Sequence, residues 1–153
     1  EQFKGYKFAT ERSQHLMSLG IPLNTDSTLK GQTVFLAERC GELMHDSIIT
    51  DRTILDVMAF TMNAKSIPYQ DKEAFETYAS EFIREYDYIF YISPHGLDIE
   101  DNGVRETDEH YRDLIDFTIT SLIKRHGHKA GKVEKISGST DERIQQILTI
   151  TGL

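Results

Sequence analysis

The sequence predicts an α/β fold with a mainly parallel sheet and helices packed against it. Short apolar runs alternate with longer segments of helical period along the 153 residues, which is typical of such folds. The hydrophobic and charged fractions, 39% and 27%, are those of an ordinary globular domain. No apolar run approaches the roughly 18 residues that a membrane span requires.

The first half of the chain is expected to contain two short strands and two helices. The first strand covers residues 6–10, and a polar helix over 11–19 ends at Gly20, a usual place for a helix to stop. A second helix starts at Leu29, from which apolar side chains recur every three or four positions. This helix leads to the second strand, residues 47–50.

The middle of the chain contains the most apolar segments. Residues 54–62 are apolar almost all round, which predicts a helix buried on more than one side. The helix after Pro68 has one apolar stripe, formed by Phe75, Tyr78, Ala79, Phe82, Ile83 and Tyr86. Residues 88–92 are β-branched and aromatic, and they predict a central strand covered on both faces.

The last third is expected to contain a loop, a helix, a strand and a final helix. Residues 94–105 read as an exposed acidic loop, and an amphipathic helix follows them. The last strand covers 133–136, and Ser139 and Glu142 have capping-box spacing at the start of the final helix. Since no repeat or interdomain linker interrupts this order, one domain covers residues 1–153.

Charge and cysteine content argue against several classes of protein. The net charge of −8 argues against non-specific binding to nucleic acid, which needs clustered Lys and Arg. The single cysteine, Cys40, excludes an internal disulfide framework and fits a reducing, cytoplasmic setting. The sequence opens at Glu1 without a secretory leader, and we expect a further segment upstream of the first strand.

Polar or small side chains follow each predicted strand. In an open parallel sheet, ligands bind beyond the carboxyl ends of the strands. The side chains at these ends are Glu11 and Arg12, Asp51 and Arg52, Ser93 and Pro94, and Ser137, Gly138 and Ser139. Together they predict a polar rim over an apolar sheet.

Two carboxylates on this rim each have two interpretations. Glu11 could be a general base that accepts a proton from an attacking hydroxyl, or a solvated carboxylate at a helix start. Asp51 could hold a water bound to Mg²⁺, or it could cap a helix that starts at Arg52. The sequence leaves both pairs of alternatives open.

The acidic loop contains a candidate phosphate ligand, Arg105. A guanidinium can donate two hydrogen bonds to one phosphate, and a mobile arginine would bring positive charge to a transition state. The alternative is an ordinary acidic turn in which Arg105 forms a surface ion pair. His126 and His128 lie in a turn rich in Gly and Lys without a nearby acidic partner, which predicts a surface turn.

Five segments occur in the order found in the P-loop ATPase and kinase family, and the chain resembles that family. They are ATER (9–12), IITDRTILD (48–56), YDYIFYI (86–92), DNGVR (101–105) and ISGSTDER (136–143). The family includes nicotinamide riboside kinase domains and small phage and bacterial ATP-binding proteins. The resemblance implies a three-layer α/β fold, in which helices flank a P-loop-type parallel sheet.

The resemblance also implies an ATP- and Mg²⁺-dependent kinase acting on a nucleoside-like or nucleotide-like small molecule. It places Glu11 and Arg12 on the acceptor side, with Asp101 nearby. It places Asp51 and Arg52 in the substrate and metal region, with Asp51 as the Mg²⁺ ligand. Glu11 or Asp51 would act on the acceptor hydroxyl as the general base.

On the nucleotide side, the resemblance implies a lid over about residues 94–106. Arg105 belongs to this lid and would act on the phosphates during catalysis. Ser137, Gly138 and Ser139 would lie beside the adenine base. These roles are implied by the resemblance alone.

The family's phosphate loop, Gly-x-x-x-x-Gly-Lys-Ser/Thr, is absent from the sequence. In the family this loop follows the first strand, so the resemblance places it upstream of Glu1, in a missing piece of about 30 residues. Two alternatives stay open: an ATPase or GTPase-type regulator without a small-molecule acceptor, and a binding module that naturally lacks the loop. The acceptor, the choice between ATP and GTP, and the oligomeric state are left open.

Overall fold

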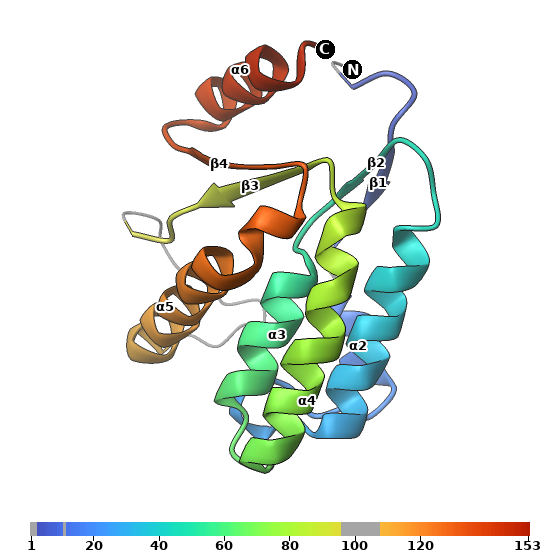
Figure 1. The fold of residues 1–153 in the computed structure, drawn as a ribbon, viewed down its shortest axis with the longest axis vertical. Coiled ribbons are helices and arrows are strands. Elements are labelled where there is room, and N and C mark those ends of the chain that lie inside the picture. The colour runs from blue at the N-terminus through green and yellow to red at the C-terminus, as the bar shows by residue number, and fades with distance from the viewer. Residues whose placement is uncertain (1–2, 11, 96–107) are drawn as a thin grey trace.

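A computed structural model of the protein describes residues 3–10, 12–95 and 108–153 (Figure 1). Within these residues the chain is mixed α/β, with helices predominating and four short strands. All strand pairs are parallel, which confirms the α/β class expected from the sequence.

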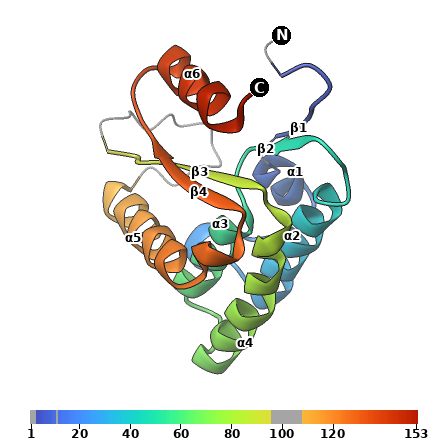
Figure 2. The same ribbon diagram turned by 45° about the horizontal axis from the view of Figure 1, so that its top comes forward.

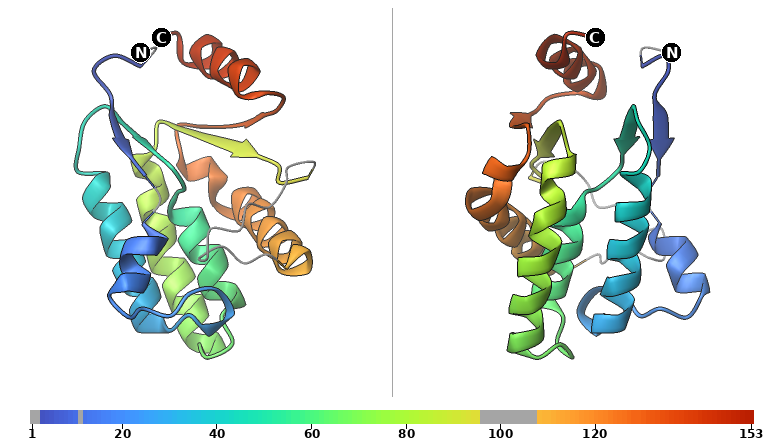
Figure 3. Two further views of the ribbon diagram at one scale, coloured as in Figure 1. Left: turned by 180° about the vertical axis from the view of Figure 1, so that it is seen from behind. Right: turned by 45° about the vertical axis from the view of Figure 1, so that its right-hand side comes forward.

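The strands form two small sheets instead of the single sheet that the sequence predicted. In one sheet β1 (Lys7–Ala9) pairs with β2 (Ile48–Thr50), and in the other β3 (Tyr88–Ile92) pairs with β4 (Lys132–Ile136). Figure 3 (right) shows β2 and β3 as the two inner strands, but no described ladder joins them. Two-stranded sheets are marginally stable alone, so these pairs depend on the helices around them.

The helices lie where the apolar periodicity predicted them. They are α1 (Ser13–Ser18), α2 (Leu29–Glu42), α3 (Ile54–Asn63), α4 (Tyr69–Ala79), α5 (Glu109–His126) and α6 (Thr140–Thr151). Short 3₁₀ helices cover Asn24–Asp26, Ser80–Glu85 and Gly127–Lys129. The second of these continues the apolar stripe of α4 towards β3.

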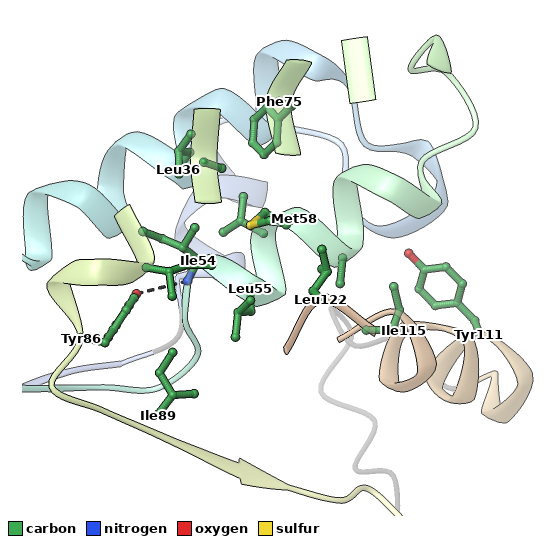
Figure 4. Packing of buried hydrophobic residues seen from close by; sticks show 14 residues of the cluster. Leu36, Ile54, Leu55, Met58, Phe75, Tyr86, Ile89, Tyr111, Ile115 and Leu122 are labelled. Atoms are coloured by element: carbon green, nitrogen blue, oxygen red, sulfur yellow. Dashed lines mark hydrogen bonds between the residues drawn. The ribbon is translucent and has the colours of Figure 1, made fainter. Parts of the chain in front are cut away.

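Helix α3 is the centre of the hydrophobic core. It packs against α2, α4 and α5, and Figure 4 shows its side chains among the labelled core residues of these helices. Ile54, Leu55 and Met58 are almost completely buried, which confirms that this helix is covered on more than one side. Because three other helices hold α3 in place, the turn that precedes it, residues 51–53, is also held in place.

Strand β3 differs from the expectation of a strand covered on both faces. Ile89 is buried against the helices, but Tyr88 and Ile92 on the opposite face are 38% and 41% exposed. The rings of Tyr88 and Phe90 stack on that open face, with centroids 5.9 Å apart. Helix α6 follows β4 and lies on the side of the β3–β4 pair away from α5 (Figure 2), but it has no buried residue and leaves Tyr88 and Ile92 partly exposed.

Candidate functional site

The carboxyl ends of the strands form two separate groups. The β1–β2 register places Ala9 beside Thr50, and the Asp51 amide donates to the Ala9 carbonyl at 2.8 Å. The β3–β4 register places Ile92 beside Ile136, so the chain segments after these two residues start side by side. The predicted polar rim is therefore divided into a β1–β2 half and a β3–β4 half.

Asp51 occupies the turn between β2 and α3. The alternative role as a helix cap is wrong, because α3 begins at Ile54 and its cap is Thr53. Thr53 accepts from the Leu55 amide at 3.1 Å and donates its own amide to Asp56 at 2.7 Å, forming a complete capping box. The exposed Asp51 carboxylate is thus left at the strand end, outside the helix.

Arg52 has an unusual backbone beside Asp51. Its φ of +77° lies in the left-handed region, which non-glycine residues rarely adopt. The guanidinium carbon lies 5.5 Å from the centroid of the Phe60 ring, and that ring lies 6.4 Å from the Tyr111 ring. Aromatic side chains from α3 and α5 therefore position the Arg52 side chain at the end of β2.

Arg12 lies in a different electrostatic setting. Its Nε is 3.6 Å from Oε1 of Glu42, whose other carboxylate oxygen accepts from Arg39 Nη1 at 2.7 Å. Glu42 and Arg39 are both buried, whereas the Arg12 side chain is exposed. Because one Glu42 carboxylate faces two arginines, the group keeps a net positive charge, and the exposed Arg12 side chain is the part of it that an anionic ligand can reach.

The turn after β4 holds its own polar groups. Ser139 caps α6 in a capping box with Glu142, and these hydrogen bonds lower the pKa of Glu142. Gly138 has φ +96°, and a Cβ there would lie 2.5 Å from a Glu142 oxygen, so only glycine fits. The Ser137 backbone is held by the Gln146 side chain at 2.7 Å. A shallow hollow lies over this turn, and the Ser139 hydroxyl is already used to cap α6.

Within the β3–β4 half, further polar residues that were not predicted from the sequence gather at the end of β3. The Tyr91 hydroxyl donates to Asp116 Oδ1 at 2.7 Å, and His95 Nε2 lies 3.8 Å from Asp116 Oδ2. Lys135 Nζ lies 6.0 Å from the centroid of the Tyr91 ring. We refer to Tyr91, His95, Asp116 and Lys135 as the β3-end cluster. Its only sequence signals are a tyrosine within an apolar strand and an aspartate within an amphipathic helix.

Three predicted site residues and most of the predicted lid are not placed by the structure. Glu11, Asp101 and Arg105 lie outside the described residues, as do residues 96–107. Among the described residues, no group of three or more His, Cys, Asp or Glu side chains is arranged to hold a metal ion. A single carboxylate such as that of Asp51 suits Mg²⁺ that is also bound by phosphates and water.

Family models, curated proteins and solved structures were all compared with the chain, and none of them matches it. In the described part of the chain, none of the helices combines the length and apolar character needed to cross a bilayer. Function must therefore be inferred from the residues at the strand ends.

Proposed function

We propose that the protein is an ATP- and Mg²⁺-dependent phosphotransferase that acts on a nucleoside-like or nucleotide-like small molecule. The observation that carries this proposal is the turn after β2, where an exposed Asp51 is followed by Arg52 with a left-handed backbone. Strained non-glycine residues persist where their surroundings hold them, and they cluster at active sites. An aspartate at the end of a strand is a usual position for a group that holds Mg²⁺ beside nucleotide phosphates.

The proposed chemistry assigns a role to each half of the rim. Glu11 or Asp51 would accept the proton of the acceptor hydroxyl, whose oxygen then forms a bond to the γ-phosphorus while ADP departs. Arg12, Arg52 and Asp101 would bind the acceptor. Arg105 would stabilise the negative charge on the transferring phosphoryl group, and residues 137–139 would lie beside the base. Mg²⁺ held at Asp51 would neutralise the phosphate oxygens.

The proposal includes the finer fold class, a three-layer P-loop-type sheet flanked by helices. The inner strands β2 and β3 each have one described partner, which lies on the outer side (Figure 3). One further parallel strand between them would join the two pairs into one sheet. A phosphate loop after that strand would lie between Asp51 and the β3–β4 half, where the nucleotide is expected. The strand and loop would belong to a segment that the printed sequence does not include.

A phosphotransfer screen of the full-length protein tests the proposal. Nucleosides, nucleoside monophosphates and nicotinamide riboside are each incubated with ATP labelled at the γ-phosphate and Mg²⁺. We expect one acceptor class to be phosphorylated, and Asp51→Asn to lower kcat/KM by about a hundredfold. Asp46→Asn is the matched control, because Asp46 is also exposed but precedes β2 at its opposite end.

The other outcomes distinguish the competing functions. Release of phosphate without a phosphorylated acceptor would support an ATPase or GTPase-type regulator instead. Absence of both nucleotide binding and turnover would support a binding module. An equal loss of activity in Asp51→Asn and Asp46→Asn would remove the assigned role of Asp51.

A further inference from the structure

The β3-end cluster is not used by the proposed function, although it lies at the same edge of the strands. Tyr91 and Lys135 are register partners on β3 and β4, and Asp116 reaches Tyr91 from α5. His95 follows β3 by three residues and faces the same carboxylate. Side chains from three elements therefore meet where the β3–β4 half would bind a ligand.

The two oxygens of Asp116 have different partners. Tyr91 donates to Oδ1, while Oδ2 faces His95 Nε2. Burial and the hydrogen bond to Asp116 raise the pKa of Tyr91 to about 12, so its hydroxyl stays a proton donor near neutral pH. The Tyr91 hydroxyl thus anchors the carboxylate, which leaves Oδ2 for the imidazole.

The exposure of the two side chains suits ligand binding by His95. The Asp116 side chain is 14% exposed and the His95 side chain is 65% exposed. With Nε2 directed at the carboxylate, Nδ1 lies on the far side of the imidazole ring. In a protonated imidazole both ring nitrogens are donors, so Nδ1 can donate to an anion while Nε2 faces Asp116.

We propose that protonated His95, together with Lys135, binds a phosphate group of the nucleotide, and that Asp116 and Tyr91 hold the imidazolium in place. The inference rests on the proposed function, because a polyphosphate is the ligand expected at this edge. Charge-assisted hydrogen bonds to phosphate are stronger than neutral ones. The described group that faces His95 is the Asp116 carboxylate from α5; Tyr91 from β3 donates to that carboxylate, and Lys135 from β4 lies over the Tyr91 ring.

Histidine is the side chain whose charge ordinarily changes near neutral pH, so phosphate binding here should weaken as the pH rises. A purely structural role is the alternative, in which His95 only ties the segment after β3 to α5. In that case the imidazole ring would not respond to a polyphosphate.

NMR of the imidazole nitrogens in the full chain tests the proposal, with inorganic tripolyphosphate as the probe. We expect tripolyphosphate to shift the His95 ring signals, which His95→Gln identifies, and to leave those of exposed His128 unchanged. Tripolyphosphate itself gains negative charge between pH 6 and pH 8, so the two proteins are compared at each pH. The ratio of wild-type affinity to His95→Gln affinity should be about threefold smaller at pH 8 than at pH 6. Asp116→Asn should weaken binding at the lower pH.

Two results would overturn the inference: equal shifts for His95 and His128, or an unchanged pH dependence in His95→Gln. The phosphotransfer screen separates this inference from the proposed function. If His95 responds to tripolyphosphate but no acceptor is phosphorylated, the phosphate site stands and the phosphotransferase proposal fails. If an acceptor is phosphorylated with the same pH profile in wild type and His95→Gln, only the His95 inference fails.

Discussion

Arg52 combines an unfavourable backbone with a favourable side-chain contact. A left-handed conformation costs a non-glycine residue about 1–2 kcal/mol, and Arg52 has φ +77°. Its guanidinium lies over the Phe60 ring, a contact that contributes about 0.5–1 kcal/mol at an exposed site. The contact offsets part of the strain, and it also fixes the position of the Arg52 charge.

Two substitutions at Arg52 separate these effects. Arg52→Gly and Arg52→Ala both remove the contact with Phe60, but only glycine removes the backbone strain. We expect the glycine variant to be more stable than the alanine variant by about 1 kcal/mol, which is roughly 3 °C in Tm. Thermal denaturation of both variants measures this difference. If the alanine variant is at least as stable as the glycine variant, the backbone at Arg52 is not strained.

The Tyr86 hydroxyl satisfies a backbone group that the first turn of α3 leaves unpaired. It accepts from the Ile54 amide at 3.2 Å, as the dashed line in Figure 4 shows, and Tyr86 is only 8% exposed. Burial raises the pKa of Tyr86, so the hydroxyl stays neutral. Removing this oxygen would leave a buried donor without its partner.

We expect Tyr86→Phe to lower the free energy of unfolding by about 1–2 kcal/mol, because the ring is kept and only the acceptor is lost. Tyr78→Phe is the matched control, since Tyr78 is 63% exposed and should change stability little. Urea denaturation of both variants provides the comparison. Similar midpoints for the two variants would show that the Ile54 amide does not depend on Tyr86.

At the level of elements, α4 and α5 are joined by an ion cluster centred on Glu76. The Glu76 carboxylate lies 2.9 Å from Arg125 Nη2 and 2.7 Å from His126 Nε2. Burial alone would raise the pKa of Glu76, but hydrogen bonds from His126 and Arg125 outweigh it and the pKa is lowered. The cluster therefore stabilises the packing of these helices when Glu76 is ionised.

The contribution of Glu76 should depend on pH in a defined direction. A carboxyl group whose pKa is lower in the folded state stabilises the fold above its unfolded pKa, and this stabilisation is lost as the pH falls through its folded pKa. We expect Glu76→Gln to lower the free energy of unfolding by about 0.5–1 kcal/mol at pH 7. Urea denaturation should show this difference shrinking below the usual glutamate pKa of 4.5. A difference that stays constant down to about pH 3 would contradict a role for ionised Glu76.

Local patterns predicted the elements well, because helix and strand periods appear directly in the spacing of apolar residues. The spacing of apolar residues did not predict whether both faces of β3 are buried. Continuous apolar composition shows that a strand tolerates burial, but it does not show whether a second layer is present. Tyr88 and Ile92 have the composition of a covered face and are partly exposed in the described structure.

The site was less predictable than the elements. Asp51 and Thr53 are both good capping residues, so the sequence could not choose between them before the first turn of α3 was known. His126 was expected in a surface turn and instead lies half-buried against Glu76, 50 positions earlier in the chain. The Tyr91–Asp116 contact likewise joins a strand to a distant helix. Tertiary packing creates such contacts, and neither the helical nor the strand spacing of apolar residues predicts them.

On the scale of the whole molecule, burial is distributed unevenly. The core surrounds α3 and continues to β3 through Ile89, whereas β1 and β2 have no fully buried residue. Phe8 on β1 is largely exposed. Because the two sheets share no described ladder, the β1–β2 pair has few apolar contacts that would keep it closed.

Amide hydrogen exchange should therefore show two levels of protection in this chain. The Asp51 amide, bonded to Ala9 across the β1–β2 pair, should exchange roughly a hundredfold faster than the Met58 amide inside α3, because local opening exposes little apolar surface at the strands. Mass spectrometry or NMR of exchanging amides measures both rates after correction for sequence. If a longer chain supplies a strand between β2 and β3, protection of Asp51 should rise towards that of Met58. Equal protection in the present chain would show that the β1–β2 pair and the α3 core open together, without help from another strand.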